Sequence, residues 1–134
     1  QKLLLLVAGT LLILIATLII VSPVDFYAAN SIELGANVSL LNELKAPAGF
    51  LLAAGLFILG AVFVRRMNNT AMLLATMIYL SYAASRFASM LFDGVPAEGL
   101  IQAAVLETFI GLACLAVLLI RQVPARKVAS CTAR

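Results

Sequence analysis

Four long apolar stretches, separated by short polar segments, dominate the hydrophobic pattern of the chain. They cover residues 3–21, 47–64, 70–92 and 99–120. An α-helix rises about 1.5 Å per residue, so about 20 apolar residues cross a hydrocarbon core that is roughly 30 Å thick. The second stretch is the shortest, and its helix can extend toward Leu40. Lipid contains no water that could hydrogen-bond the backbone N–H and C=O groups. Each stretch must therefore form these hydrogen bonds internally, as a helix does. The pattern predicts an all-α integral membrane four-helix bundle.

The polar segments predict how these helices are connected. The links RRMNN (65–69) and DGVPAE (93–98) are short, which indicates antiparallel hairpins between the second, third and fourth helices. The connection at 22–45 is longer and partly apolar, so we expect a short helix or a lid on the outer membrane surface. The whole chain, 1–134, is predicted to be a single transmembrane domain with a cytoplasmic tail at 121–134.

Composition supports a membrane protein and excludes several classes of function. Of the 134 residues, 64% are hydrophobic and 11% are charged, whereas soluble domains are near half apolar and a quarter charged. The first apolar run follows Lys2 but is too long for a typical signal peptide, so we expect an uncleaved helix. The chain has no His, the commonest general base and metal ligand, and no basic or aromatic stripe typical of nucleic-acid binding. We therefore expect no metal, no cofactor and no nucleic-acid partner.

Charge is distributed unequally between the two predicted sides of the membrane. With four spans, the termini and the 65–69 link share one side, which carries seven basic residues against a single one, Lys45, on the other. The seven are Lys2, Arg65, Arg66, Arg121, Arg126, Lys127 and Arg134, and the acidic residues of the opposite side are Asp25, Glu33, Glu43, Asp93 and Glu98. The positive-inside rule then predicts that both termini are cytoplasmic, with the basic residues close to anionic membrane lipids.

The third predicted helix carries a polar face that includes its charged residue. Counting from Tyr79, the residues Tyr82, Arg86, Ser89 and Asp93 follow at offsets of 3, 7, 10 and 14, which places them on one side of a helix. Apolar side chains occupy the other faces. We therefore expect Arg86 to point into the bundle, about 10 Å from the outer end of its helix.

Glu107 in the fourth helix is the expected partner of Arg86. It follows Glu98 by nine residues, a depth of roughly 13 Å from the same side. Small residues around it, including Gly111, allow close approach of a neighbouring helix. An unpaired charge at this depth costs at least ~2.5 kcal/mol, so the sequence predicts an intramembrane salt bridge.

A third contribution to this site is expected from the entrance of the second helix. Asn42 and Glu43 lie there, followed by Lys45. Two carboxylates near one arginine leave a surplus negative charge. Either Lys45 balances this charge, or one of the carboxyl groups stays protonated. The predicted ligand-binding residues are Asn42, Glu43, Tyr82, Arg86, Ser89, Asp93 and Glu107.

Three interpretations of these polar residues remain open. A buried Arg–Glu pair can simply fix helix rotation and register. Intramembrane ionisable groups are also candidates for a lipid, small-molecule or ion site. Paired carboxyl groups can perform acid–base catalysis, but no nucleophile, metal cluster or phosphate loop accompanies them, and no catalytic residue is assigned.

Three sequence blocks resemble a family of small bacterial four-helix membrane proteins catalogued as a domain of unknown function. The blocks are NELKAPAG (42–49), SRFASMLFDGVP (85–96) and LETFIG (106–111). The matching positions are Asn42, Glu43, Lys45, Ala46, Gly49, Arg86, Ser89, Asp93, Gly94, Pro96, Glu107 and Gly111. Lys45 stands where the family more often has Arg, which argues against a bidentate role there. The resemblance implies a bacterial cytoplasmic (inner) membrane and the convergence of Glu43, Arg86 and Glu107, but no activity.

Together these features favour a non-enzymatic integral membrane protein. Its expected role is to bind a lipid or small hydrophobic ligand in a polar pocket of the outer half, or to act as an accessory subunit of a membrane complex. A small oligomeric transporter, proton-coupled through Glu107 or Glu43, is the alternative, and a carboxylate-based membrane isomerase is a third interpretation. Membrane lipids are the expected partners, together with further copies of the chain or a larger membrane complex.

Overall fold

The elements of the described residues are all helical, with no strands, as the hydrophobic pattern predicts. The computed structural model describes the backbone of residues 1–131 and the side chains of residues 1–121, so 132–134 of the predicted tail lie outside the described residues. The elements are α1 (Lys2–Val21), α2 (Pro23–Ala28), α3 (Val38–Ala61), the 3₁₀ turn η1 (Arg65–Met67), α4 (Asn68–Phe92) and α5 (Glu98–Cys131). Four of the helices are long and apolar enough to cross a membrane.

Two helix boundaries differ from the sequence-based expectation. The helix expected to begin at Pro47 begins at Val38, because the side chain of Asn37 accepts a hydrogen bond from the Leu40 amide (3.1 Å) and caps it. Pro47 therefore lies inside α3, where its missing N–H removes one backbone hydrogen bond. At the other end of the chain, α5 continues to Cys131, past the predicted end of the fourth helix at 120.

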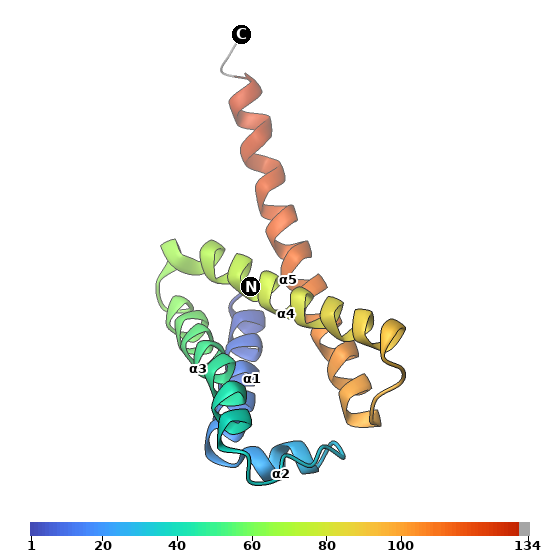
Figure 1. Ribbon diagram of the computed structural model, residues 1–134. Coiled ribbons are helices and arrows are strands. Elements are labelled where there is room, and N and C mark those ends of the chain that lie inside the picture. The colour runs from blue at the N-terminus through green and yellow to red at the C-terminus, as the bar shows by residue number, and fades with distance from the viewer. Residues whose placement is uncertain (132–134) are drawn as a thin grey trace.

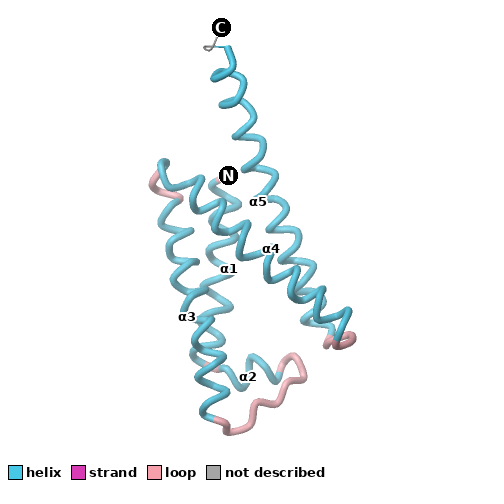
Figure 2. Tube along the Cα trace, turned by 45° about the horizontal axis from the view of Figure 1, so that its top comes forward, coloured by secondary structure: helices cyan, strands magenta, loops and turns pink. Residues whose placement is uncertain are grey.

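The long helices form two pairs that diverge toward one end of the molecule. The most extensive contacts join α1 to α3 and α4 to α5. The pairs come together near the N-terminus and separate toward α2, which lies between them (Figures 1 and 2). We call these two ends the η1 end and the α2 end. The short η1 link thus does not produce the tight α3–α4 hairpin that its length suggested, since these two helices contact each other less extensively.

Glycines bring the helices of each pair close together. A Cβ atom on Gly55 of α3 would lie 3.0 Å from the carbonyl oxygen of Gly9 in α1. A Cβ atom on Gly111 of α5 would lie 3.2 Å from the amide nitrogen of Leu80 in α4. Small residues at such crossings let two backbones approach closely. The resulting van der Waals contacts hold helices together in lipid, where no hydrophobic effect drives them together.

The core lies where the two pairs meet. Its largest fully buried side chains come from all four long helices: Leu5, Ile58, Met72 and Cys114. The hydroxyl of Tyr79 in α4 donates a hydrogen bond to the carbonyl oxygen of Ala8 in α1 (2.7 Å), which links one pair to the other. Toward the α2 end this packing stops, because the helices have diverged.

Candidate functional site

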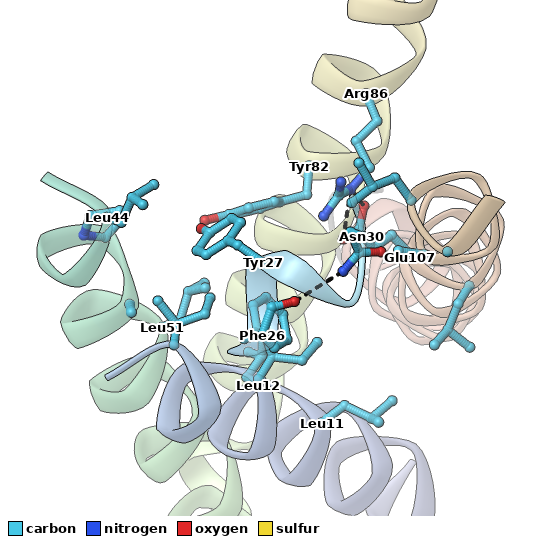
Figure 3. A pocket seen from close by; sticks show the side chains of 18 of the residues that line it. Leu11, Leu12, Phe26, Tyr27, Asn30, Leu44, Leu51, Tyr82, Arg86 and Glu107 are labelled. Carbon is cyan, nitrogen blue, oxygen red and sulfur yellow. Dashed lines mark hydrogen bonds and ion pairs between the residues drawn. The ribbon is translucent and has the colours of Figure 1, made fainter. Parts of the chain in front are cut away.

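A cavity of about 480 Å³ occupies the space between the two diverging helix pairs (Figure 3). It lies within the size range of ordinary small-molecule sites. Most of its lining is aliphatic and comes from α1, α3, α4 and α5, including Leu12, Ile15, Ile19, Leu51, Ile78 and Leu100. Its polar lining consists of Tyr27, Asn30, Tyr79, Tyr82, Arg86 and Glu107. The cavity is therefore apolar over most of its wall, with a few polar groups.

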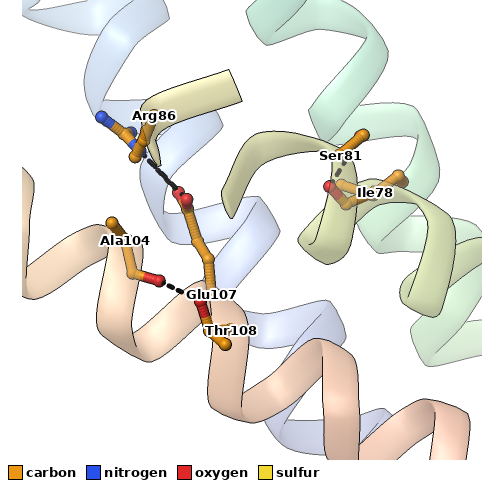
Figure 4. A network of polar contacts seen from close by, with 6 residues as sticks. All are labelled: Ile78, Ser81, Arg86, Ala104, Glu107 and Thr108. Carbon is orange, nitrogen blue, oxygen red and sulfur yellow. Dashed lines mark hydrogen bonds and ion pairs between the residues drawn. The ribbon is translucent and has the colours of Figure 1, made fainter. Parts of the chain in front are cut away.

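An ion pair between α4 and α5 forms the charged part of this lining (Figure 4). The Nε–H of Arg86 donates to Oε2 of Glu107 at 3.0 Å and to Oε1 at 3.2 Å. The two side chains are 30% and 12% exposed, respectively. One residue along α5, the hydroxyl of Thr108 donates to the carbonyl oxygen of Ala104 at 2.7 Å, which leaves the carboxylate of Glu107 to Arg86.

The ion pair uses only part of the donor capacity of Arg86. A guanidinium group carries five N–H donors and no acceptor. The hydrogen bonds found for Arg86 within the described residues all start from Nε. Its two terminal nitrogens, Nη1 and Nη2, thus have no protein acceptor in this part of the chain. The guanidinium lies at the cavity wall, which Asn30 and Tyr82 also line (Figure 3).

Two tyrosines add neutral hydrogen-bonding groups close to the ion pair. Tyr27 comes from α2 and Tyr82 from α4 (Figure 3). Partial burial raises the pKa of the Tyr27 hydroxyl above its ordinary value of 10.0, and the positive charge of Arg86 opposes this rise. Tyr27 is therefore protonated at neutral pH and can donate a hydrogen bond as well as accept one.

The α2 segment reaches across to the first turn of α5. The side-chain amide of Asn30 donates to the carbonyl oxygen of Phe26 (3.3 Å), which fixes its orientation after α2. A Cβ atom on Gly99 would lie 2.5 Å from Oδ1 of Asn30, so the contact depends on glycine at this position. The segment that was expected to form a short helix or lid thus contributes part of the cavity wall.

The predicted site residues divide into two groups. Tyr82, Arg86 and Glu107 line the cavity, and Arg86 contacts Glu107 directly. The other four do not line it: Asn42, Glu43, Ser89 and Asp93 are exposed. Ser89 instead donates to the carboxylate of Asp93 (2.8 Å) within the last turns of α4.

The convergence of Glu43 with Arg86 and Glu107 is therefore not present in the structure. Glu43 lies on an exposed face of the first turns of α3, while Leu44 on the adjoining face lines the cavity. Glu107 is then the single carboxylate of the cavity lining, so no surplus negative charge arises there.

Sequence reasoning anticipated a short helix or lid after α1 but did not include its residues among the predicted site residues. Phe26, Tyr27 and Asn30 line the cavity, and the rings of Phe26 and Tyr27 meet edge to face with centroids 5.4 Å apart. The available signal was a pair of aromatic residues in a polar outer connection. That signal indicates partial burial but does not identify what the rings contact.

The polar chemistry of the cavity consists of hydrogen-bonding groups and one ion pair. Among the described residues, no group of three or more His, Cys, Asp or Glu side chains could hold a metal ion. The carboxylate of Glu107 is engaged by Arg86 rather than by a second acid. The cavity therefore combines hydrogen-bond donors that are unpaired within the described residues with a large apolar wall.

Comparison with known proteins places the chain in a family. The family model described as "Domain of unknown function (DUF4345)" matches residues 1–118, which include every residue of the cavity lining. No curated protein and no solved structure matches the chain. The match covers all four helices that can cross a membrane, up to Leu118 of α5. The chain belongs to the DUF4345 family, a family of unknown function.

Proposed function

We propose that this chain is a non-enzymatic integral membrane protein that binds a lipid or similar amphiphilic molecule in the cavity between its helix pairs. The observation that carries the proposal is the composition of the cavity wall, which is aliphatic over most of its area and polar around Arg86 and Glu107. An amphiphile matches such a wall, because its tail replaces lipid or water against the aliphatic side chains while its head meets the polar groups.

The membrane environment and the orientation form part of the same proposal. The four apolar helices support insertion in a membrane. The seven basic residues that the sequence places in the termini and the 65–69 link support a cytoplasmic location for the end that carries η1. The cavity then opens in the outer half of a bacterial cytoplasmic membrane, within reach of the lipid of that leaflet.

The unused donors of Arg86 indicate the chemistry of the head group. Nη1 and Nη2 of Arg86, which lines the cavity, have no acceptor among the described residues. A carbonyl, hydroxyl or phosphate oxygen of the ligand would satisfy them. The hydroxyl groups of Tyr27 and Tyr82 can assist, since each both donates and accepts.

The decisive experiment fills the cavity and measures the bound molecule. Ala103 lines the cavity from α5, and Ala113 on the same helix is exposed and lies outside it. The protein and its variants Ala103→Phe and Ala113→Phe are purified in mild detergent, and native mass spectrometry quantifies the amphiphile that each retains. We expect Ala103→Phe to retain at least about tenfold less amphiphile than the native protein, because the phenyl ring occupies the space of the amphiphile. Ala113→Phe should retain the native amount.

A second variant tests the polar end of the cavity. Arg86→Lys keeps the positive charge next to Glu107 but removes the planar fork of donors. It should reduce retention of the amphiphile while leaving the thermal midpoint of unfolding close to that of the native protein. Equal retention by Ala103→Phe and Ala113→Phe would overturn the proposal, as would an absence of any co-purifying amphiphile in all variants.

A further inference from the structure

A second cavity lies at the η1 end of the bundle, away from Arg86 and Glu107. Its volume is about 470 Å³. The lining comes from the beginning of α1, from η1 and the start of α4, and from α5, and consists of Gln1, Lys2, Arg65, Asn68 and Arg121. Segments far apart in the sequence thus bring three cationic side chains to one hollow.

The positive charge of this cavity is not balanced by the protein. All six acidic residues of the chain lie between positions 25 and 107, and none belongs to the lining. The ion pair found among the described residues is the one at the other cavity. In addition, Nε2 of Gln1 is buried without a hydrogen-bond partner in the described part of the chain. The cavity therefore presents three positive charges and no acidic side chain.

A buried asparagine holds the turn that carries Arg65. Asn68 is 7% exposed. With its amide group oriented to satisfy its neighbours, its nitrogen donates to the carbonyl oxygen of Val64 (3.3 Å) and to that of Ala61. These contacts close the connection between α3 and α4, so the backbone at Arg65 is fixed rather than a free loop.

The three cations lie at the same boundary of the candidate membrane spans. Lys2 begins the first span, Arg65 begins the third, and Arg121 ends the fourth. Such boundaries lie at the level of lipid head groups, where anionic lipids attract basic side chains. The position of the cavity thus suits an anion that is either part of the membrane or dissolved beside it.

We propose that this basic cavity binds a phosphate group, supplied by an anionic membrane phospholipid or by a soluble phosphate. Arginine forks match phosphate oxygens in bidentate geometry, and lysine adds a point charge. Two Arg and one Lys around one hollow can therefore surround a phosphate from several sides. A zwitterionic lipid is disfavoured, since its own ammonium group would be brought close to three cations.

Arg66 provides a matched control because it is exposed in the same turn as Arg65 but does not line the cavity. The experiment uses the purified protein and its variants Arg65→Gln, Arg121→Gln and Arg66→Gln. Native mass spectrometry measures binding of phosphatidylglycerol, with phosphatidylcholine as the zwitterionic probe. Thermal unfolding with inorganic phosphate at constant ionic strength forms the soluble arm.

A specific site predicts unequal effects of neighbouring charges. If the attraction were only diffuse, each basic residue would contribute about 1 kcal/mol, or roughly fivefold in affinity. Arg65→Gln and Arg66→Gln would then weaken binding equally. We expect Arg65→Gln and Arg121→Gln to weaken phosphatidylglycerol binding at least about tenfold and Arg66→Gln less than about twofold. The native protein can instead be stabilised by inorganic phosphate and bind phosphatidylglycerol no better than phosphatidylcholine. If Arg65→Gln abolishes that stabilisation, the phosphate comes from a soluble source.

Two outcomes would overturn the proposal. One is an equal loss of binding in Arg65→Gln and Arg66→Gln, and the other is an absence of response to both probes in the native protein. If Arg65→Gln does not fold, Arg65→Lys replaces it, since it keeps the charge but loses the bidentate fork. A phosphate site then predicts a severalfold loss of binding in Arg65→Lys, and unchanged binding contradicts it.

Discussion

The two cavities of this protein have nearly equal volumes, about 480 Å³ and about 470 Å³, but opposite chemistry. The cavity at the α2 end is largely aliphatic, and its single cation, Arg86, is paired with the carboxylate of Glu107. The cavity at the η1 end is lined by polar residues, and its three cations have no acidic partner in the described residues.

The difference reflects what each environment does to a charge. In an apolar wall, Coulomb attraction is strong and the loss of hydration is costly, so a charge requires a nearby counter-charge. At the η1 end the three cationic side chains are exposed, so water solvates them and the protein can leave them without partners. Changes to charged residues should therefore affect stability strongly at the first cavity and weakly at the second.

Removal of one member of the ion pair should have the largest effect. Glu107→Leu leaves the guanidinium of Arg86 without its partner, and we expect it to lower the free energy of unfolding by about 3 kcal/mol. The double variant Arg86→Leu/Glu107→Leu should recover most of this loss, because it leaves no unpaired charge. Reversible unfolding in mixed micelles measures both. A double variant as unstable as Glu107→Leu alone would contradict this explanation.

A smaller effect is expected at the close crossing of α1 and α3, where Gly9 and Gly55 line neither cavity. Gly55→Ala places a methyl group against the backbone of α1 at Gly9, which should separate α1 from α3 and cost about 1–3 kcal/mol. Gly49 lies in the same helix with open space around it, so Gly49→Ala should be neutral or stabilise by up to about 1 kcal/mol. Thermal unfolding of the two variants side by side tests this, and similar midpoints would refute the close-crossing explanation.

The smallest effect on stability is expected at the basic cavity. Arg65→Gln should change the free energy of unfolding by no more than about 0.5 kcal/mol in the absence of phosphate, because the side chain is exposed and unpaired with any acid. The same unfolding assay as for Glu107→Leu provides the measurement. If Arg65→Gln lowered the free energy of unfolding as much as Glu107→Leu, the proposed difference between paired and unpaired charges in the two cavities would be contradicted.

The sequence by itself determined the number and approximate place of the long helices. Hydropathy is a local property, so four apolar stretches give four helices without knowledge of their packing. It also allowed Arg86 to be matched with Glu107, because helical spacing and chain direction fix depth along adjacent antiparallel helices. The match over residues 1–118 likewise confirms the resemblance to a family of unknown function.

Only the tertiary structure decided which residues share a cavity. The rotation of each helix depends on distant contacts, such as the approach of Gly9 to Gly55, and hydrophobic periodicity in apolar helices fixes it only weakly. For this reason Glu43 was expected in the site and lies outside it, whereas Tyr27 lies in it through the position of α2. The cavity itself exists because the two helix pairs diverge, and that divergence is a property of packing between pairs rather than of any single segment.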